Sequence, residues 1–278
     1  MKLASVTVLY NTTEEELLDN LVSYADLVDV LILWDNTPSP NDLERIVQRW
    51  SATILIQNGE NVGLGDAYNR AYDIAKRYDC THLMTMDQDT KFIDFGKFRK
   101  WAENQSDNIL HCQVGGYHNS DNETEVMDVW CQSATIFPLA MLDKIGLFRS
   151  DYFIGMIDAE IGLRAAHAGY CVIQYNGTNA QHNLTQPATG KLFGHTVHLY
   201  NYSPFRHYYE SRNRILIAKE YPSDFDKRYI SRFVIARLKL IVKILLFENN
   251  KACKTGAIIS GTFNGLLKKA VPYNHFKQ

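Results

Sequence analysis

Hydrophobic runs alternate with amphipathic segments through the N-terminal third of the chain. Near-continuous apolar runs rich in β-branched residues are typical of strands buried on both faces, and they lie at residues 3–11, 28–36, 52–58 and 81–89. Apolar positions at helical spacing lie between them, at residues 13–25, 41–50 and 65–78. Thr12 or Thr13 is the expected cap of the first helix. Strands joined by helical crossovers form right-handed βαβ units, so the pattern predicts an α/β fold with a mostly parallel sheet and helices on both faces.

Composition and charge narrow the class of protein. The chain has 278 residues, of which 46% are hydrophobic and 22% charged, enough for one large domain or a domain with an appendage. A net charge of −2 gives no overall basic field, which argues against nucleic acid as a partner. The five cysteines include no C-x-x-C pair, which argues against a disulfide framework or a zinc knuckle. The N-terminus leads directly into a strand pattern rather than a signal-peptide pattern. This pattern and the scattered cysteines predict a cytoplasmic protein.

Polar side chains gather where the predicted strands end. They are Tyr10-Asn11, Asp35-Asn36, Gln57-Asn58 and Asp87-Gln88-Asp89. Asn and Asp favour turns after any strand, which is a sufficient reason at a single strand. Because ligands of parallel sheets bind beyond the carboxyl ends of the strands, four strands that end alike favour a binding crevice.

Asp87 and Asp89 are separated by one residue, so on a strand both side chains leave the sheet on the same side. Two like charges placed side by side repel each other. A shared divalent cation with oxygen ligands would relieve the repulsion, and a diphosphate would complete its coordination. A D-x-D tripeptide is common by chance in loops, so the pair alone is a weak indication.

The segment NVGLGDAYNRA contains Gly63 and Gly65, like the start of a dinucleotide fingerprint. Tyr68 stands where the third glycine of that fingerprint would be, and the segment follows the third strand rather than the first. These departures argue against a Rossmann oxidoreductase. Two interpretations remain: a glycine turn whose helix N-terminal amides face a phosphate or sugar, or a flexible loop in which Asp66 is an ordinary acid of the first helical turn.

The ordered set VLYN, WDN, NVGLGDAYNRA and DQD resembles the inverting family 2 glycosyltransferases of GT-A fold. The form N-x-G-x-G-x-A-x-N followed by M-x-x-D-Q-D-T is most similar to bacterial rhamnosyltransferases of surface-polysaccharide synthesis, and the resemblance covers roughly residues 3 to 215. It implies a nucleotide-sugar donor and Mn²⁺ or Mg²⁺. The donor contacts that it implies are Tyr10, Asn11, Asp35, Asn36, Asn61, Gly63, Asp66, Asn69, Asp87, Gln88, Asp89 and Arg212.

The segment DYFIGMIDAEIGLRAAHAGY is similar to the family's E-D-x-D/E-x-x-x-R motif. By that match Asp158 is the catalytic base, and a carboxylate suits removal of a proton from an acceptor hydroxyl. Ile157 replaces the acid that commonly precedes the base, so Glu160 is the second catalytic candidate. Glu160 and Arg164 also have the i,i+4 spacing of an ion pair that would only orient the segment. The acceptor contacts that the resemblance implies are Trp130, Gln132, Asp158 and Arg164, with a core position the alternative for Trp130.

Two further residues are assigned through the resemblance. His182 lies where family members often carry a histidine that completes the metal site with Asp87 and Asp89, and such a ligand set suits Mn²⁺ better than Mg²⁺. A structural histidine is the alternative. Arg212 lies in a segment similar to the family's Y-Y-x-x-R-N, where a guanidinium can bind a phosphate, unless it belongs to a basic helix face in water.

Residues 227–251 predict a long amphipathic helix, and SGTFNGLLKK a second, shorter one. One stripe of the long helix is apolar and another is basic, and Arg237 interrupts the apolar residues as well, so the helix is not expected to span a bilayer. The stripes consist of Val234, Leu238, Ile241 and Leu245, and of Arg232, Lys239 and Lys243. The helix either lies in a membrane interface or packs on the catalytic domain.

The sequence thus predicts a GT-A catalytic domain at residues 1–220, with a donor half at 1–92 and an acceptor half at 93–220, and a helical extension at 221–278. The expected reaction is inverting, metal-dependent transfer of L-rhamnose from dTDP-rhamnose to a saccharide or polyprenyl-linked acceptor in O-antigen or capsule synthesis. The alternatives are a UDP-sugar donor (galactofuranose, glucose or an N-acetylhexosamine) and a catalytically silent GT-A-like module. The expected location is the cytoplasm or the inner face of its membrane, with the oligomeric state open.

Overall fold

The computed structural model describes residues 1–39, 42–50, 52–105, 107–115, 122–182, 188–192 and 195–268. The chain divides into two compact units. The first comprises Met1–Ser150 and Ile157–Asn183, and the second comprises Asp151–Met156 and Leu184–Gln278. The sequence prediction assigned residues 204–220 to the catalytic domain, whereas in the structure they belong to the second compact unit.

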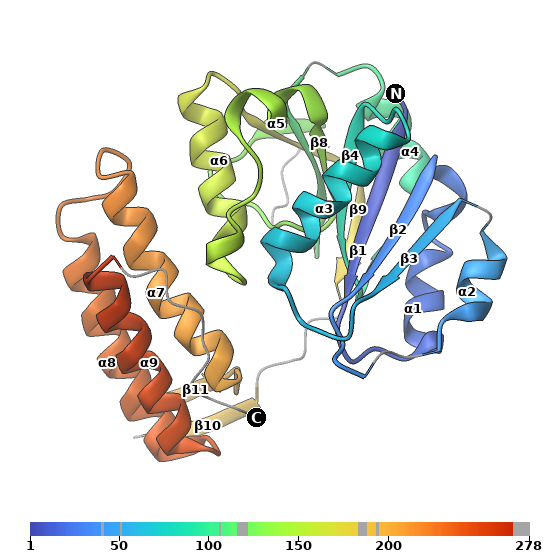
Figure 1. The fold of residues 1–278 in the computed structure, drawn as a ribbon. Coiled ribbons are helices and arrows are strands. Elements are labelled where there is room, and N and C mark those ends of the chain that lie inside the picture. The colour runs from blue at the N-terminus through green and yellow to red at the C-terminus, as the bar shows by residue number, and fades with distance from the viewer. Residues whose placement is uncertain are drawn as a thin grey trace. The chain divides into compact units, whose positions relative to one another are not determined.

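A nine-stranded sheet forms the centre of the first unit (Figure 1). Its order is β3 (Thr53–Gln57), β2 (Val30–Asp35), β1 (Leu3–Leu9), β4 (His82–Asp87), β8 (Thr135–Pro138), β6 (Ile109–Val114), β9 (Val172–His182) and β5 (Thr90–Phe92), with β7 (Thr124–Val126) paired to β9. Strands β3, β2, β1 and β4 are mutually parallel, as the sequence pattern predicts. β8 is antiparallel to both of its neighbours, which completes a mixed sheet.

Helices cover both faces of this sheet. α1 (Glu14–Leu21), α2 (Glu44–Arg49) and α4 (Phe95–Ala102) share one hydrophobic core with one face of β1, β2 and β4. α3 (Gly63–Arg77) packs on the other face through Ala67, Ala71 and Ala75 (Figure 1). The remaining helical elements of the unit are the short turn η1 (Ala25–Leu27), α5 (Leu139–Ile145) and α6 (Ile157–His167). Helices on both faces account for the apolar runs in β1 and β2, which are buried on both sides.

The helix boundaries refine the sequence prediction. Thr13, not Thr12, caps α1, because its hydroxyl accepts a hydrogen bond from the Glu16 amide and the Glu16 carboxylate accepts one from the Thr13 amide. α3 begins at Gly63, two residues before the predicted start, and Gly63 has φ = 83°. The short turn η2 (Ser150–Tyr152) marks the passage from the first unit to the second.

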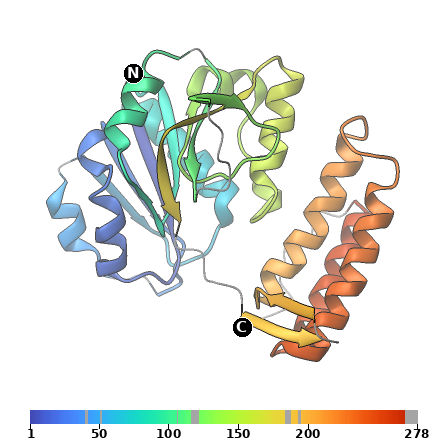
Figure 2. The same ribbon diagram turned by 180° about the vertical axis from the view of Figure 1, so that it is seen from behind.

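The second unit contains a hairpin and three long helices (Figure 2). The hairpin pairs β10 (Ala188–Leu192) with β11 (His195–Leu199), and the helices are α7 (Pro204–Glu220), α8 (Tyr229–Phe247) and α9 (Lys251–Leu266). α9 is longer than the short helix predicted from its sequence. Among the described residues, no helix combines the length and the hydrophobicity needed to cross a bilayer.

Two glycines allow α9 to pack directly on α7. A Cβ atom on Gly261 would overlap the carbonyl oxygen of Tyr208, and one on Gly265 would lie 2.8 Å from the carbonyl oxygen of Arg212. The helix backbones are therefore in contact at these two positions. Segment 151–156 joins the same packing, since the Asn213 side-chain amide lies 2.9 Å from the Tyr152 and Gly155 carbonyl oxygens.

Gly261→Val tests this close approach of helices. A side chain at this position must push α9 away from α7, so we expect a loss of about 1–3 kcal/mol in the free energy of unfolding, measured by urea denaturation. The matched control is Ala252→Val on the exposed side of α9, which should cost only about 0.5 kcal/mol through the lower helix propensity of valine. Equal losses in the two variants would show that α9 does not pack on α7 through Gly261.

Candidate metal centre and active site

The turn that follows β4 is held in place by the side chain of its middle residue. The Gln88 side chain accepts a hydrogen bond from the Tyr10 amide (2.7 Å) and donates one to the Tyr10 carbonyl oxygen (3.1 Å). The Asn20 amide group donates to the Gln88 carbonyl oxygen (2.6 Å). Gln88 therefore links the ends of β1 and β4, which leaves Asp87 and Asp89 on either side of it as the acidic groups of the turn.

A buried serine that the sequence interpretation did not single out also stabilises this turn. Ser133 is fully buried, and its hydroxyl accepts a hydrogen bond from the Asp87 amide (2.9 Å) and donates one to the Thr90 hydroxyl (2.8 Å). Ser133 precedes β8, which is adjacent to β4 in the sheet. No motif in the sequence marks this serine, because its role depends on the pairing of strands that are far apart in the chain.

The pairing of β5 with β9 places a histidine beside the two carboxylates. In this antiparallel pair Thr90 lies opposite His182. The His182 Nε2 atom is 2.9 Å from an Asp89 carboxylate oxygen and 4.0 Å from one of Asp87. One ligand atom from each of the three residues lies within 4.8 Å of the others, and all three side chains are half-buried. The structure thus brings together the predicted metal set of Asp87, Asp89 and His182.

This donor set fits a divalent cation. Two carboxylates and one imidazole supply oxygen and nitrogen ligands of the kind that Mn²⁺ accepts, and partial exposure leaves room for further ligands from a substrate or solvent. A cation at this position would also remove the repulsion between the two carboxylates. Among the described residues, no other group of acidic, histidine and cysteine side chains has this arrangement.

Asp158 approaches the same region from α6. It lies in the first turn of the helix, where one of its carboxylate oxygens accepts a hydrogen bond from the Ala159 amide (2.8 Å). Burial raises the pKa of the Tyr68 hydroxyl, and the charges of Asp87 and Asp158 raise it further. The same three causes raise the pKa of the Cys131 thiol to about 12. The charges of Asp87 and Asp158 thus both reach Tyr68 and Cys131.

Glu160 and Arg164 form a buried ion pair on the other side of α6. Glu160 is only 2% exposed, and its two carboxylate oxygens accept hydrogen bonds from the Arg164 guanidinium at 3.1 and 2.7 Å. The guanidinium also donates to the carbonyl oxygens of Ile145 and Leu147. Arg164 thereby fixes α6 to the end of α5. This geometry favours the interpretation in which Glu160 and Arg164 orient the segment that carries Asp158.

The predicted donor residues at the end of β2 are buried and hydrogen-bonded within the protein. The Asp35 carboxylate accepts hydrogen bonds from the Thr37 amide (2.9 Å) and the Gln57 side chain (3.0 Å). Asn36 accepts from the Trp34 indole (3.0 Å) and the Val62 amide (3.2 Å). Both residues join the end of β2 to neighbouring loops. Their side chains hold the loop backbone in place and are not exposed to a ligand.

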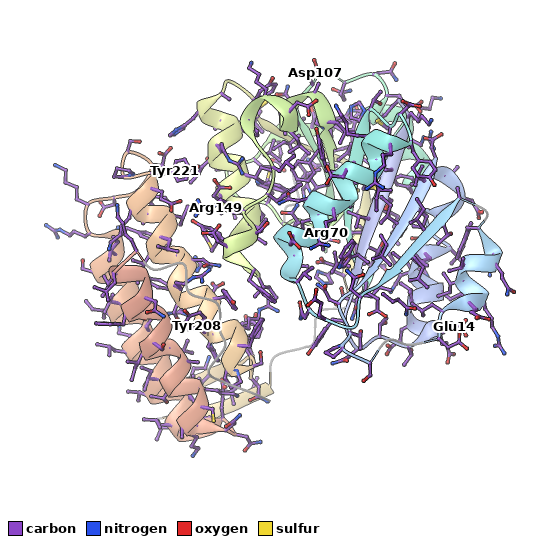
Figure 3. All side chains as sticks on the ribbon, in the orientation of Figure 1. Glu14, Arg70, Asp107, Arg149, Tyr208 and Tyr221 are labelled. Carbon is purple, nitrogen blue, oxygen red and sulfur yellow. The ribbon has the colours of Figure 1, made fainter. Side chains whose placement is uncertain are left out.

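The N-x-G-x-G-x-A-x-N segment has a comparable packing role in the described structure. Gly65 lies against the main chain of Arg149, whose carbonyl oxygen would meet any Cβ atom at position 65. Arg149 is labelled in Figure 3. Asn69 donates to the Phe148 carbonyl oxygen (2.8 Å) and accepts from the Phe148 amide (2.9 Å). Asn61 accepts from the Gly63 amide (3.0 Å). The segment is the start of α3 rather than a flexible loop, and it packs against residues 148–150.

The remaining predicted contacts differ in exposure. Asp66 pairs with Arg70 four residues later (2.9 Å), as an ordinary acid of the first turn does. Asn11 is exposed, in a left-handed conformation (φ = 48°), and Tyr10 beside it is half-buried. Asp87, Asp89 and Asp158 are half-buried, like Tyr10.

Trp130 and Gln132 lie in the segment that precedes β8. The Trp130 ring packs near Phe137 (5.9 Å between ring centroids), and its indole nitrogen would lie 3.0 Å from a Cβ on Gly162. The Gln132 side-chain oxygen is buried without a hydrogen-bond donor. Trp130 therefore packs against α6, and Gln132 has a buried acceptor with no hydrogen-bond donor among the described residues.

Arg212 belongs to the second unit and has no exposed surface. Its guanidinium donates to the carbonyl oxygen of Asp151 and to the Asn213 side chain, and it stacks on the ring of Tyr209 (4.7 Å to the centroid). The alternative of a basic helix face in water is wrong for this buried position, and the phosphate contact stays a prediction. Arg212 instead anchors segment 151–156 to α7.

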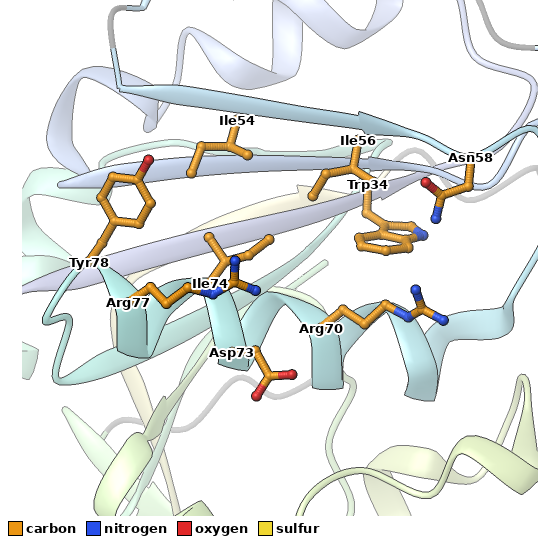
Figure 4. Close-up of a pocket in the computed structure, with 9 residues that line it drawn as sticks. All are labelled: Trp34, Ile54, Ile56, Asn58, Arg70, Asp73, Ile74, Arg77 and Tyr78. Atoms are coloured by element: carbon orange, nitrogen blue, oxygen red, sulfur yellow. The ribbon is translucent and has the colours of Figure 1, made fainter.

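A shallow groove of about 650 Å³ lies apart from these residues, between α3 and the edge of the sheet (Figure 4). Its floor is apolar and its rim carries two guanidinium groups. The lining residues are Trp34, Ile54, Ile56, Asn58, Arg70, Asp73, Ile74, Arg77 and Tyr78. The groove contains none of the metal-binding candidates, so it is not the site that the sequence motifs indicate.

Tyr68→Phe tests whether the buried Tyr68 hydroxyl has a partner in the free protein. That hydroxyl has no hydrogen-bond partner among the residues that the structure describes, so its removal should leave the free energy of unfolding unchanged or raise it by up to about 1 kcal/mol. Tyr24→Phe is the matched control, because the buried Tyr24 hydroxyl bonds to Thr7 (2.6 Å) and its loss should cost about 1 kcal/mol. A similar loss in Tyr68→Phe would mean that a partner is present.

Comparison with known proteins extends only to the fold. No protein-family model matches the sequence, and no curated protein is significantly similar to it. The chain resembles the crystal structure of GalNAc-T7 with UDP, GalNAc and Mn²⁺, with a TM-score of 0.60 and 12% identity over 78% of this chain and 47% of that one. It also resembles S. aureus TarS, with a TM-score of 0.54 and 15% identity over 84% of this chain and 43% of that one.

This chain spans less than half the length of either neighbour. Identities of 12% and 15% show the fold alone. The structural similarity to these two proteins, together with the mixed sheet, the helices on both of its faces and the C-terminal helices, confirms the glycosyltransferase fold that the sequence predicts.

Proposed function

We propose that this protein is an inverting, divalent-metal-dependent glycosyltransferase with a nucleotide-sugar donor. The observation that carries the proposal is the cluster of Asp87, Asp89 and His182 at the carboxyl end of β4. The fold similarity to GalNAc-T7, which was crystallised with UDP, GalNAc and Mn²⁺, supports the metal and the nucleotide-sugar donor, whereas inversion rests on the sequence motifs.

Asp87, Asp89 and His182 are the residues that would hold the cation. When bound, a divalent ion takes up negative charge on the departing diphosphate. The protein supplies the rest of the site: the Gln88 side chain fixes the turn, and Ser133 fixes the Asp87 amide, so both carboxylates are in place before a donor binds. Preorganisation of this kind lowers the cost of binding a charged substrate.

Asp158 is assigned the role of general base. An acceptor hydroxyl loses its proton to the Asp158 carboxylate as the oxygen attacks the anomeric carbon, and the bond from that carbon to the diphosphate oxygen breaks on the opposite side. One displacement of this kind inverts the configuration. Glu160 is the weaker candidate because both of its oxygens are occupied by Arg164 in a buried pair.

The finer assignments rest on the sequence motifs. The proposed donor is dTDP-rhamnose, and the proposed acceptor is a saccharide or a polyprenyl-linked saccharide of a bacterial surface polysaccharide. The alternative donor is a UDP-sugar, which the UDP in the GalNAc-T7 structure supports. A catalytically silent GT-A-like module is the alternative from a different class of function. The presence of all three carboxylates, Asp87, Asp89 and Asp158, argues against it.

Asp89→Ala tests the metal site. Loss of this ligand should abolish the Mn²⁺-dependent rise in melting temperature that dTDP or UDP produces in the wild type, because only a ligand that binds the native state stabilises it. Asp107→Ala, which removes an exposed carboxylate outside the cluster, should retain the full rise. An undiminished rise in Asp89→Ala, with the fold intact, would contradict the metal assignment. A larger rise in melting temperature with dTDP favours dTDP-rhamnose as the donor, and a larger rise with UDP favours a UDP-sugar.

Asp158→Asn tests the catalytic base. The amide keeps the shape of the side chain but cannot accept the proton, so kcat should fall about 100- to 10,000-fold while donor affinity stays within about twofold of the wild type. Glu160→Gln is the comparison, and it should reduce stability by about 1–3 kcal/mol because it weakens a buried, charge-assisted pair. Full turnover in Asp158→Asn with none in Glu160→Gln would transfer the role to Glu160.

A further inference from the structure

One face of α8 in the second unit is apolar and exposed. Its side chains recur at the spacing of a single helical face, each 49–59% exposed, and they are Ile235, Leu238, Val242, Leu245 and Leu246. Phe233 and Ile244 on the opposite side are buried and supply the packing of the helix. The predicted stripe had included Val234 and Ile241, which are half-buried, so the exposed stripe is rotated relative to the prediction.

The neighbouring helix α9 adds exposed apolar side chains. α8 and α9 form a helical hairpin and lie side by side in both views (Figures 1 and 2). On α9 and the residue that follows it, the exposed apolar side chains are 42–58% exposed, and they are Ile259, Phe263, Leu266 and Leu267. Single exposed hydrophobic residues are ordinary, but repeated ones along two adjacent helices are typical of a surface that contacts a partner.

Charge indicates what kind of partner suits this surface. Neither α8 nor α9 contains an acidic residue. Arg232, Lys239 and Lys243 follow one another at helical spacing beside the apolar stripe of α8. Arg232 pairs with Asp226 (3.0 Å), whereas Lys239 is exposed and has no ion pair with any residue that the structure describes. The apolar stripe therefore has a cationic border, which complements an anionic surface.

An aromatic side chain lies at the same border. The Lys243 ammonium is 5.9 Å from the centre of the Tyr200 ring, and Tyr200 is exposed. Tyrosine is enriched where a membrane meets water, because its ring is apolar and its hydroxyl is polar. A basic stripe, an exposed tyrosine and an apolar stripe together have the composition of a helix that lies in the plane of a bilayer surface.

We propose that α8 and α9 bind the surface of an anionic lipid bilayer, with the α8 stripe among the headgroups and Lys239 and Lys243 at the level of the lipid phosphates. A second copy of the chain is a poorer occupant. Two α8 stripes facing each other would bring their lysines together without an acidic residue on either helix to balance them. The proposal does not depend on the sugar-transfer chemistry of the first unit.

Flotation with lipid vesicles tests the proposal on the full-length protein. We expect binding to phosphatidylcholine vesicles that contain a third phosphatidylglycerol, and little binding to phosphatidylcholine alone. Lys239→Gln should weaken binding about fivefold, the usual contribution of one basic side chain near an anionic membrane. The double variant Leu238→Gln, Val242→Gln should weaken it at least about tenfold through lost apolar burial. Ile93→Gln, a matched change at an exposed site of the first unit, should have no effect.

Binding that is equal for neutral and anionic vesicles, or unchanged in the α8 variants, would overturn the proposal. So would a wild-type dimer in light scattering that fails to bind vesicles and becomes monomeric in the double variant, because the stripe would then be a dimer interface. Circular dichroism confirms that each variant is folded. Metal-dependent nucleotide binding is measured in parallel, so failure at the membrane and failure at the active site are separate results.

Discussion

Repulsion between Asp87 and Asp89 is the constraint on which the proposed metal site depends. Two carboxylates that leave one end of a buried strand raise the free energy of the folded protein unless an opposite charge lies between or beside them. The protein nevertheless fixes both. Gln88 and Ser133 hold the turn, and the β5–β9 pairing brings His182 to 2.9 Å from Asp89. An arrangement that costs stability and is braced from three directions is typical of a functional site.

The motif residues around this cluster hold the backbone of the surrounding loops in place. Asp35, Asn36 and Asn69 are hydrogen-bonded to neighbouring loops, and Gly65 allows α3 to touch the main chain of Arg149. Such contacts determine where the strand ends and the start of α3 lie. The side chains of these motif residues therefore stabilise the loops at the strand ends.

Local patterns and long-range pairing differ in how far the sequence reveals them. The parallel order of β3, β2, β1 and β4 follows from apolar runs and crossovers, which are properties of neighbouring residues. His182 joined the predicted metal set only through a family resemblance, since its position opposite Thr90 is a matter of strand register. Ser133 and the burial of Arg212 depend on contacts between distant segments and left no sequence signal. The rotation of the α8 stripe has the same cause, because the packing of Phe233 and Ile244 decides which face remains exposed.

Pulsed electron paramagnetic resonance of the Mn²⁺-loaded protein with UDP or dTDP would test the central claim most directly. If Asp87, Asp89 and His182 hold the ion that binds the diphosphate, the bound Mn²⁺ should show coupling to one imidazole nitrogen and to phosphorus of the nucleotide. His182→Ala should remove the nitrogen coupling alone. Mn²⁺ that shows only solvent protons, or a nitrogen coupling that persists in His182→Ala, would contradict a metal centre at this site.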